Sequence, residues 1–85
     1  MYLCIEVLTY SNVRNEITNQ SINSTRIIKN RDKAVEWLLD LQEYWEAYGA
    51  SVLVEPSAYN LSLMVEFKDS RGILETRLYQ CVVRK

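Results

Sequence analysis

The sequence predicts an α+β domain of two layers, in which one amphipathic helix packs against an antiparallel sheet of four to five strands. Three observations predict this class. Apolar and polar residues alternate with the period of a β-strand near both ends of the chain. One central segment, residues 31–48, has instead the three-and-four spacing of a helix. The 85 residues, of which 48% are hydrophobic, suffice for one core, so we expect a single domain over residues 1–85.

Two strands are expected before the helix. Residues 1–10 alternate as a half-buried strand does. One face of that strand carries Leu3, Ile5 and Val7, and the other carries Tyr2, Cys4, Glu6 and Tyr10. Residues 11–25 are rich in Asn, Ser and Thr, whose side chains favour turns, so we expect a long connection in which a strand could begin near Ile22. Residues 25–29 then end a second strand, which forms a hairpin with the first.

The expected helix has recognisable start and stop residues. Asn30 is a suitable N-cap, Asp32 places negative charge in the first turn, and Gly49 can take the left-handed conformation that ends a helix. The face toward the sheet comprises Ala34, Trp37, Leu38, Leu41, Tyr44, Trp45 and Tyr48. We expect Trp37, Trp45 and Tyr48 to belong mainly to the core, because one helix that covers a sheet needs large side chains there.

Three strands are expected after the helix, which gives the order strand, strand, helix, strand, strand, strand. Residues 51–55 are rich in β-branched side chains, and residues 60–67 show the clearest alternation. Residues 68–72 predict a hairpin loop, in which Gly72 can take a positive φ. In residues 73–83, Leu74, Thr76, Leu78 and Val82 alternate with Glu75, Arg77, Tyr79 and Cys81.

The chain has few of the histidine, cysteine and glycine residues from which catalytic, metal-binding and phosphate-binding sites are usually built. It contains no histidine, which excludes Ser-His-Asp and Cys-His nucleophiles, His-ligated metals and the usual general base. Two distant cysteines cannot form a Cys₄ zinc site, and neither glycine lies in a phosphate-binding loop. Carboxylates do gather on the helix, but a convex helix face offers no partly dry site. We therefore expect a protein that is not an enzyme and that holds no cofactor and no metal.

Cys4 and Cys81 lie in the first and last apolar segments. The chain shows no signal-peptide pattern and no apolar run long enough to span a membrane, so we expect a cytoplasmic protein without a membrane partner. In a reducing compartment both cysteines should be buried free thiols. A disulfide between them would require the two terminal strands to be neighbours.

Two regions are candidates for binding another protein. The helix carries an acidic stripe opposite the core, which could be a solvated face or could dock a basic partner. An apolar pair beside the core face could be the periphery of the core or a small interface. The connection over residues 12–24 is the other region, because long connections in small domains are usually functional or mobile. The candidate partner-binding residues are Asp32, Glu36, Asp40, Glu43, Val35, Leu39, Asn15 and Asn19.

The basic residues indicate an alternative, although the net charge is only −1. They gather in residues 26–33 and 67–85, whereas residues 34–66 contain no base. The two groups could combine at one edge of the sheet and bind nucleic acid. The acidic helix and the lack of an RNA-binding signature argue against it. The residues concerned are Arg26, Lys29, Arg31, Lys33, Arg77, Arg84 and Lys85.

The segment TRIIKNRDKAVEWLLDLQEYWEAYG, residues 25–49, resembles small proteins of phages and mobile elements, in which a strand runs directly into an amphipathic helix and a β-meander follows. Small inhibitors of host defence, including anti-CRISPR proteins, are similar in size, in an acidic helix face and in lacking catalytic residues. The resemblance implies inhibition by occupying a surface of a host protein. We therefore expect a protein-binding module whose partner is a host or phage protein and which could also form a homodimer. A nucleic-acid-binding accessory protein is the alternative.

Overall fold

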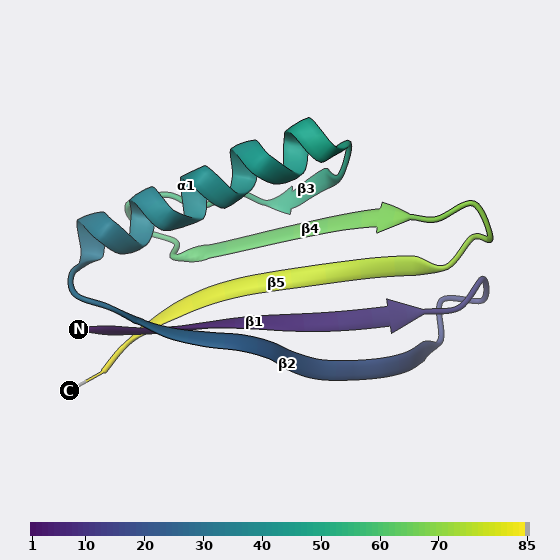
Figure 1. Ribbon diagram of the computed structural model, residues 1–85, viewed down its shortest axis with the longest axis horizontal. Coiled ribbons are helices and arrows are strands. Elements are labelled where there is room, and N and C mark those ends of the chain that lie inside the picture. Colours follow the sequence, from purple (N-terminus) through teal and green to yellow (C-terminus); the bar gives the residue numbers. More distant parts are fainter. Residues whose placement is uncertain (85) are drawn as a thin grey trace.

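The computed structural model describes residues 1–84 and confirms the α+β class (Figure 1). The elements are β1 (Tyr2–Ser11), β2 (Ile17–Ile28), α1 (Arg31–Tyr48), β3 (Ser51–Val54), β4 (Ser62–Lys68) and β5 (Leu74–Val83). The strands form one antiparallel sheet in the order β2-β1-β5-β4-β3. The first and last strands of the chain are therefore neighbours in the middle of the sheet, and β2 and β3 are its edges.

The helix begins and ends where the sequence predicts. The Asn30 side chain accepts a hydrogen bond of 2.9 Å from the backbone N–H of Lys33, which satisfies one of the free donors of the first turn. Gly49 has a φ of 98°, and its N–H donates to the carbonyl of Glu46. The helix is fixed to the sheet by Ala34, Leu38 and Trp45, which are buried.

The connection expected over residues 11–25 is mostly strand, so that expectation is wrong. The turn is confined to residues 12–16, where the Asn12 side chain accepts hydrogen bonds from the N–H groups of Arg14 and Glu16. Asn15 has a φ of 62°, a left-handed conformation that Asn tolerates better than most residues. From Ile17 onward the polar residues pair with β1 along its whole length. Backbone pairing with β1 thus outweighs the turn preference of these side chains.

The two central strands turn their more polar face toward the helix. Where only one face of an antiparallel sheet is covered, the apolar set normally packs on the core. Here the buried residues on the helix side of β1 and β5 are instead Cys4, Glu6, Glu75, Tyr79 and Cys81. The alternate residues, among them Leu3, Ile5, Val7, Leu78 and Val82, lie on the far side of the sheet. The pairing register places these residues on one face of the sheet, with Cys4 opposite Cys81 and Glu6 opposite Tyr79.

Cys4 and Cys81 form a disulfide, which corrects the expectation of free thiols. The two residues are directly paired across β1 and β5, with their Cα atoms 4.0 Å apart, and both are buried. A disulfide requires the two terminal strands to be neighbours, and β1 and β5 are adjacent in the sheet. The bond joins positions 77 residues apart in the chain.

The helix aromatics belong to the core only in part. Trp45 is 6% exposed and stacks on Phe67, with ring centroids 5.7 Å apart, and Trp37 is half-buried. Tyr48, expected in the core, is 62% exposed, and Tyr44 is also exposed. Tyr48 lies in the last turn of the helix, where its ring contacts those of Phe67 and Trp45 edge to face and stacks on the exposed ring of Tyr44.

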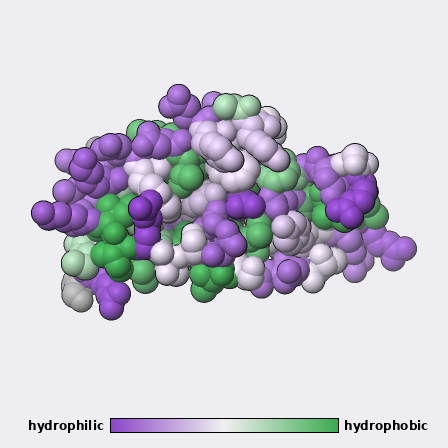
Figure 2. All heavy atoms as spheres, viewed as in Figure 1, coloured by the Kyte–Doolittle hydropathy of each residue, from purple (hydrophilic) through white to green (hydrophobic). Residues whose placement is uncertain are grey.

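The helix covers only part of one face of the sheet. It runs along β3 and β4, and the long hairpin of β1 and β2 extends beyond its cover (Figure 1). The molecule measures 40 × 25 × 18 Å along its principal axes. In the same view, hydrophobic residues form separate groups among hydrophilic ones (Figure 2).

Candidate functional site

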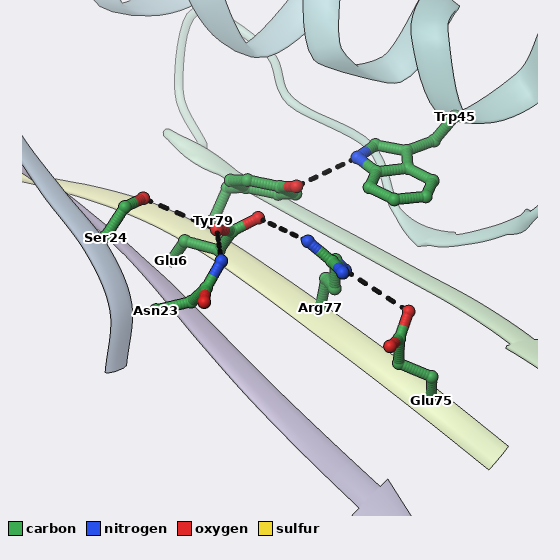
Figure 3. A network of polar contacts seen from close by, with 7 residues as sticks. All are labelled: Glu6, Asn23, Ser24, Trp45, Glu75, Arg77 and Tyr79. Atoms are coloured by element: carbon green, nitrogen blue, oxygen red, sulfur yellow. Dashed lines mark hydrogen bonds and ion pairs between the residues drawn. The ribbon is translucent and has the colours of Figure 1, made fainter. Parts of the chain in front are cut away.

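Glu6 is the centre of a polar network between the helix and the sheet (Figure 3). Its carboxylate accepts hydrogen bonds from Asn23 at 2.6 Å and from Ser24 at 3.4 Å. Arg77 donates to Glu6 at 3.2 Å and to Glu75 at 3.3 Å, so one guanidinium bridges two carboxylates. Because these residues come from β1, β2 and β5, the network ties three neighbouring strands together.

Trp45 connects the helix to this network. Its indole N–H donates to the Tyr79 hydroxyl at 2.9 Å (Figure 3), and Tyr79 is paired with Glu6 across β1 and β5. The Arg77 guanidinium lies 4.9 Å from the centroid of the Trp45 ring, a cation–π contact. Throughout residues 1–84, no buried side-chain nitrogen or oxygen lacks a hydrogen-bond partner. The network is therefore a satisfied polar layer, of the kind that fixes how elements pack.

The contacts within the network fix its charges. Burial raises the pKa of the Glu6 carboxyl, but hydrogen bonds from Tyr79, Asn23 and Arg77 together outweigh burial, so its pKa lies below the usual value. Burial and the hydrogen bond to Glu6 raise the pKa of Tyr79 to about 12. A hydrogen bond to Glu75 raises the pKa of Tyr10 above its ordinary value. Near neutral pH, Glu6 is thus ionised and the two tyrosines are protonated.

Glu6, Glu75 and Tyr79 are not among the site residues that the sequence predicts. Their positions nevertheless carry a signal. Glu6 is two residues from Cys4, and Tyr79 is two residues from Cys81, so each shares a strand face with a cysteine. If Cys4 is assumed to pair with Cys81 across two antiparallel strands, the same register places Glu6 opposite Tyr79.

A hollow of about 290 Å³ adjoins the network on the same face of the sheet. Tyr10 and Phe67 supply aromatic walls, and Glu75 links the hollow to the network. The remaining lining residues are Thr18, Asn19, Asp69, Arg71 and Ile73. Asp69 pairs with Arg71 at 2.9 Å, and Glu75 pairs with Arg77, so the charged groups of the hollow already have partners. The aromatic walls and the uncharged polar groups suit a segment of polypeptide.

The outer edge of β2 lies next to this hollow. β2 pairs with β1 on one side only, and all of its residues except Ile28 are exposed. From Ile17 to Thr25 the strand has neither a charged residue nor a proline, which are common protections of an edge strand. Two irregularities interrupt the ladder: Asn23 is the extra residue between the pairs of Glu6 and Val7, and Thr18 is the extra residue between the pairs of Tyr10 and Ser11. Between these two bulges, residues 19–22 pair with β1 in a regular register and carry no charge.

The acidic stripe is on the surface, as expected. Asp32, Glu36, Asp40 and Glu43 are all exposed, Leu39 is 47% exposed and Val35 is half-buried. Nearby bases offset part of the stripe. Lys33 lies 3.5 Å from Glu36, and a shallow hollow is lined by Glu36 and Asp40 together with Arg26 and Lys33.

The two candidate asparagines occupy different places. Asn19 is in β2 opposite Tyr10 and lines the hollow, whereas Asn15 is in the turn between β1 and β2. Neither belongs to a long mobile loop. Asn19 is therefore the predicted partner-binding residue that lines the hollow.

The predicted basic surface is only partly assembled. Arg77 was expected at a sheet edge, but it lies on the central strand β5, is held by Glu6 and Glu75, and its side chain is 22% exposed. It is therefore removed from the nucleic-acid candidates. Arg26 lies over the Trp37 ring at 5.5 Å from its centroid, and Arg31 donates to the carbonyl of Ala58.

Two of the predicted bases lie at the same end of the sheet, on either side of β1. Lys29 follows the last residue of β2, and Arg84 follows the last residue of β5. Both of those strand ends pair with Tyr2 of β1, at the end of the sheet where the helix begins. Lys85 lies outside the described residues.

Within residues 1–84, no three His, Cys, Asp or Glu side chains are grouped so that they could hold a metal ion. No helix in this range has the length and apolar character needed to cross a membrane. Comparison with family models, curated proteins and solved structures finds no match to this chain.

Proposed function

We propose that this chain is a protein-binding module rather than an enzyme, and that it binds an extended segment of its partner along β2. The observation that carries the proposal is the free edge of this 12-residue strand, which is uncharged from Ile17 to Thr25. An extended segment can add to such an edge through backbone hydrogen bonds, while pockets for its side chains supply specificity.

The hollow supports the same mode of binding. Thr18 and Asn19 of β2 form part of its wall. Alternate side chains of an added strand point toward the helix side of the sheet, and one of them would enter the hollow beside Tyr10 and Phe67. An apolar or aromatic side chain fits this place best, because the charged groups of the hollow are already paired.

The biological role that we propose is inhibition of a host or phage protein by occupying its surface. The resemblance of residues 25–49 to small inhibitors of host defence supports this role, and so does the cytoplasmic setting proposed from the sequence. Strand addition would suit it, because a partner segment bound along β2 is no longer free for its own contacts. The acidic stripe would then be a secondary contact for a basic region of the partner.

Capture from a bacterial lysate tests the proposal with two variants. Asn19→Lys/Ser21→Lys places two charges on the β2 edge, at positions that face the helix side opposite Tyr10 and Leu8. We expect it to weaken capture of the partner at least tenfold. Glu36→Lys/Asp40→Lys places the same number of lysines in the acidic stripe, and it should weaken capture much less because the stripe is only a secondary contact. If capture is lost with Glu36→Lys/Asp40→Lys but not with Asn19→Lys/Ser21→Lys, the partner binds the acidic stripe and the proposal of binding along β2 is wrong.

Nucleic-acid binding is a second candidate, which the position of Lys29 and Arg84 at the same end of the sheet favours. A mobility shift of duplex DNA or of RNA at low salt, lost as salt rises, would indicate it. Lys29→Glu/Arg84→Glu should then abolish the shift. If neither nucleic acid shifts at low salt, this candidate is excluded.

A further inference from the structure

The face of the sheet opposite the helix is apolar, and no element of the described chain packs on it. The helix contacts the sheet through the face that carries Cys4, Leu63 and Val65. The other face, here called the open face, is centred on Leu3, Ile5, Val7, Met64, Leu78 and Val82. Five of these six side chains are half-buried, and Val82 is 48% exposed.

The apolar residues of the open face are contiguous across the strands. The pairing register joins Val7 to Leu78 and Leu78 to Met64, and it joins Leu3 to Val82. On its other side, Leu3 pairs with Ile27 of β2, which is also 48% exposed. Contiguous apolar patches of this kind on small soluble proteins mark interaction surfaces, because isolated domains rarely expose them.

We propose that the open face is covered by the open face of a second copy of this chain. The charges of the face fit this occupant. Within its strands only two charged residues lie on this side, Glu66 and Lys68, and their charges cancel. The open face thus has no net charge, so two copies placed face to face do not repel each other. The apolar residues of one copy then contact those of the other.

The size of the face also fits a dimer. A stable interface buries roughly 800 Å² on each partner. The sheet lies in a molecule whose two longer dimensions are 40 and 25 Å, so the open face can supply an area of that order. The product would have four layers, helix, sheet, sheet and helix, with the sheets about 10 Å apart as in a β-sandwich.

The limited core of the single chain gives a reason for such pairing. In the described chain, the side chains that are almost completely buried and large are Leu38, Leu63, Val65 and Cys4. A domain of this length hides a small fraction of its surface and commonly gains stability from association. Covering the open face would turn an exposed apolar layer into a second core.

Analytical ultracentrifugation of the full chain over a range of concentrations tests the dimer. We expect a mass of two copies that dissociates on dilution. Val82→Lys and Ile27→Lys, each tested alone, place a charge on the open face and should weaken dimerisation at least tenfold. Leu39→Lys is the matched control, because Leu39 on the helix is 47% exposed and the two tested positions are each 48% exposed. It should leave the dimer unchanged, and circular dichroism should show that all three variants fold.

The outcomes separate this inference from the proposed function. A wild-type chain that is monomeric at every concentration would overturn the dimer without touching the β2 proposal. A dimer that survives Val82→Lys and Ile27→Lys but is lost in Asn19→Lys/Ser21→Lys would show that copies join through their β2 edges. That result would overturn the assignment to the open face.

Discussion

Arg77 is the residue on which the polar network most depends, because it is the one cation between two carboxylates that are nearly buried. The side chains of Arg77 and Glu6 are 22% and 8% exposed. Arg77→Met would leave Glu6 and Glu75 without a positive partner, and we expect it to lower the free energy of unfolding by about 3 kcal/mol. Arg71→Met is the control, because Arg71 pairs with Asp69 at the surface, and it should cost less than about 1 kcal/mol. Urea unfolding measures both, and equal losses would mean that the network contributes no more than a surface ion pair.

The ionisation of Glu6 and Tyr79 makes stability depend on pH at both extremes. The pKa of Glu6 is lowered in the folded chain, so its contribution is present above its ordinary value of 4.5 and is lost as pH falls through the folded pKa. The pKa of Tyr79 is raised from 10.0 to about 12, so its contribution is present below pH 10 and is lost as pH rises toward 12.

Tyr79→Phe isolates the alkaline part of this dependence. It removes the ionisable hydroxyl, so the unfolding free energy of the variant should fall less steeply between pH 10 and pH 12 than that of the wild type. Chemical unfolding at several alkaline pH values measures the slopes, and tyrosinate absorbance follows the titration directly. Equal slopes in the two proteins would show that Tyr79 titrates alike in the folded and unfolded chains.

At the scale of elements, the sequence predicts best what local chemistry determines. The helix limits follow from Asn30 and Gly49, which cap the same residues in any tertiary setting. β4 is recognised because its alternate side chains, Leu63 and Val65, are buried in the core. β2 is not recognised as a long strand, because an edge strand that is exposed except at Ile28 has no apolar period to reveal it.

The orientation of β1 and β5 could not be predicted from the strands alone. Alternation does not say which face meets the helix; in the fold the covered face is the one on which Cys4 pairs with Cys81 and Glu6 with Tyr79. The same limit applies to the candidate site. Asn19 is predicted from composition, whereas its neighbours in the hollow, Tyr10, Phe67 and Glu75, come from three other strands and are joined only by the fold.

For the whole molecule, the disulfide between Cys4 and Cys81 is the covalent link that closes the chain from its first strand to its last. A loop of 77 residues is long, and closing it restricts the unfolded chain, so we expect the bond to contribute about 4 kcal/mol to stability. Cys4→Ala/Cys81→Ala should lower the unfolding free energy by that amount, and dithiothreitol should do the same to the wild type while leaving the variant unchanged.

The bond also bears on the proposed cytoplasmic setting, because disulfides persist mainly in oxidising compartments. Thiol titration of protein released from cells under alkylating conditions measures its state there. Two reactive thiols per chain would mean that the molecule works without the link, and that its stability then depends more heavily on the open face being covered.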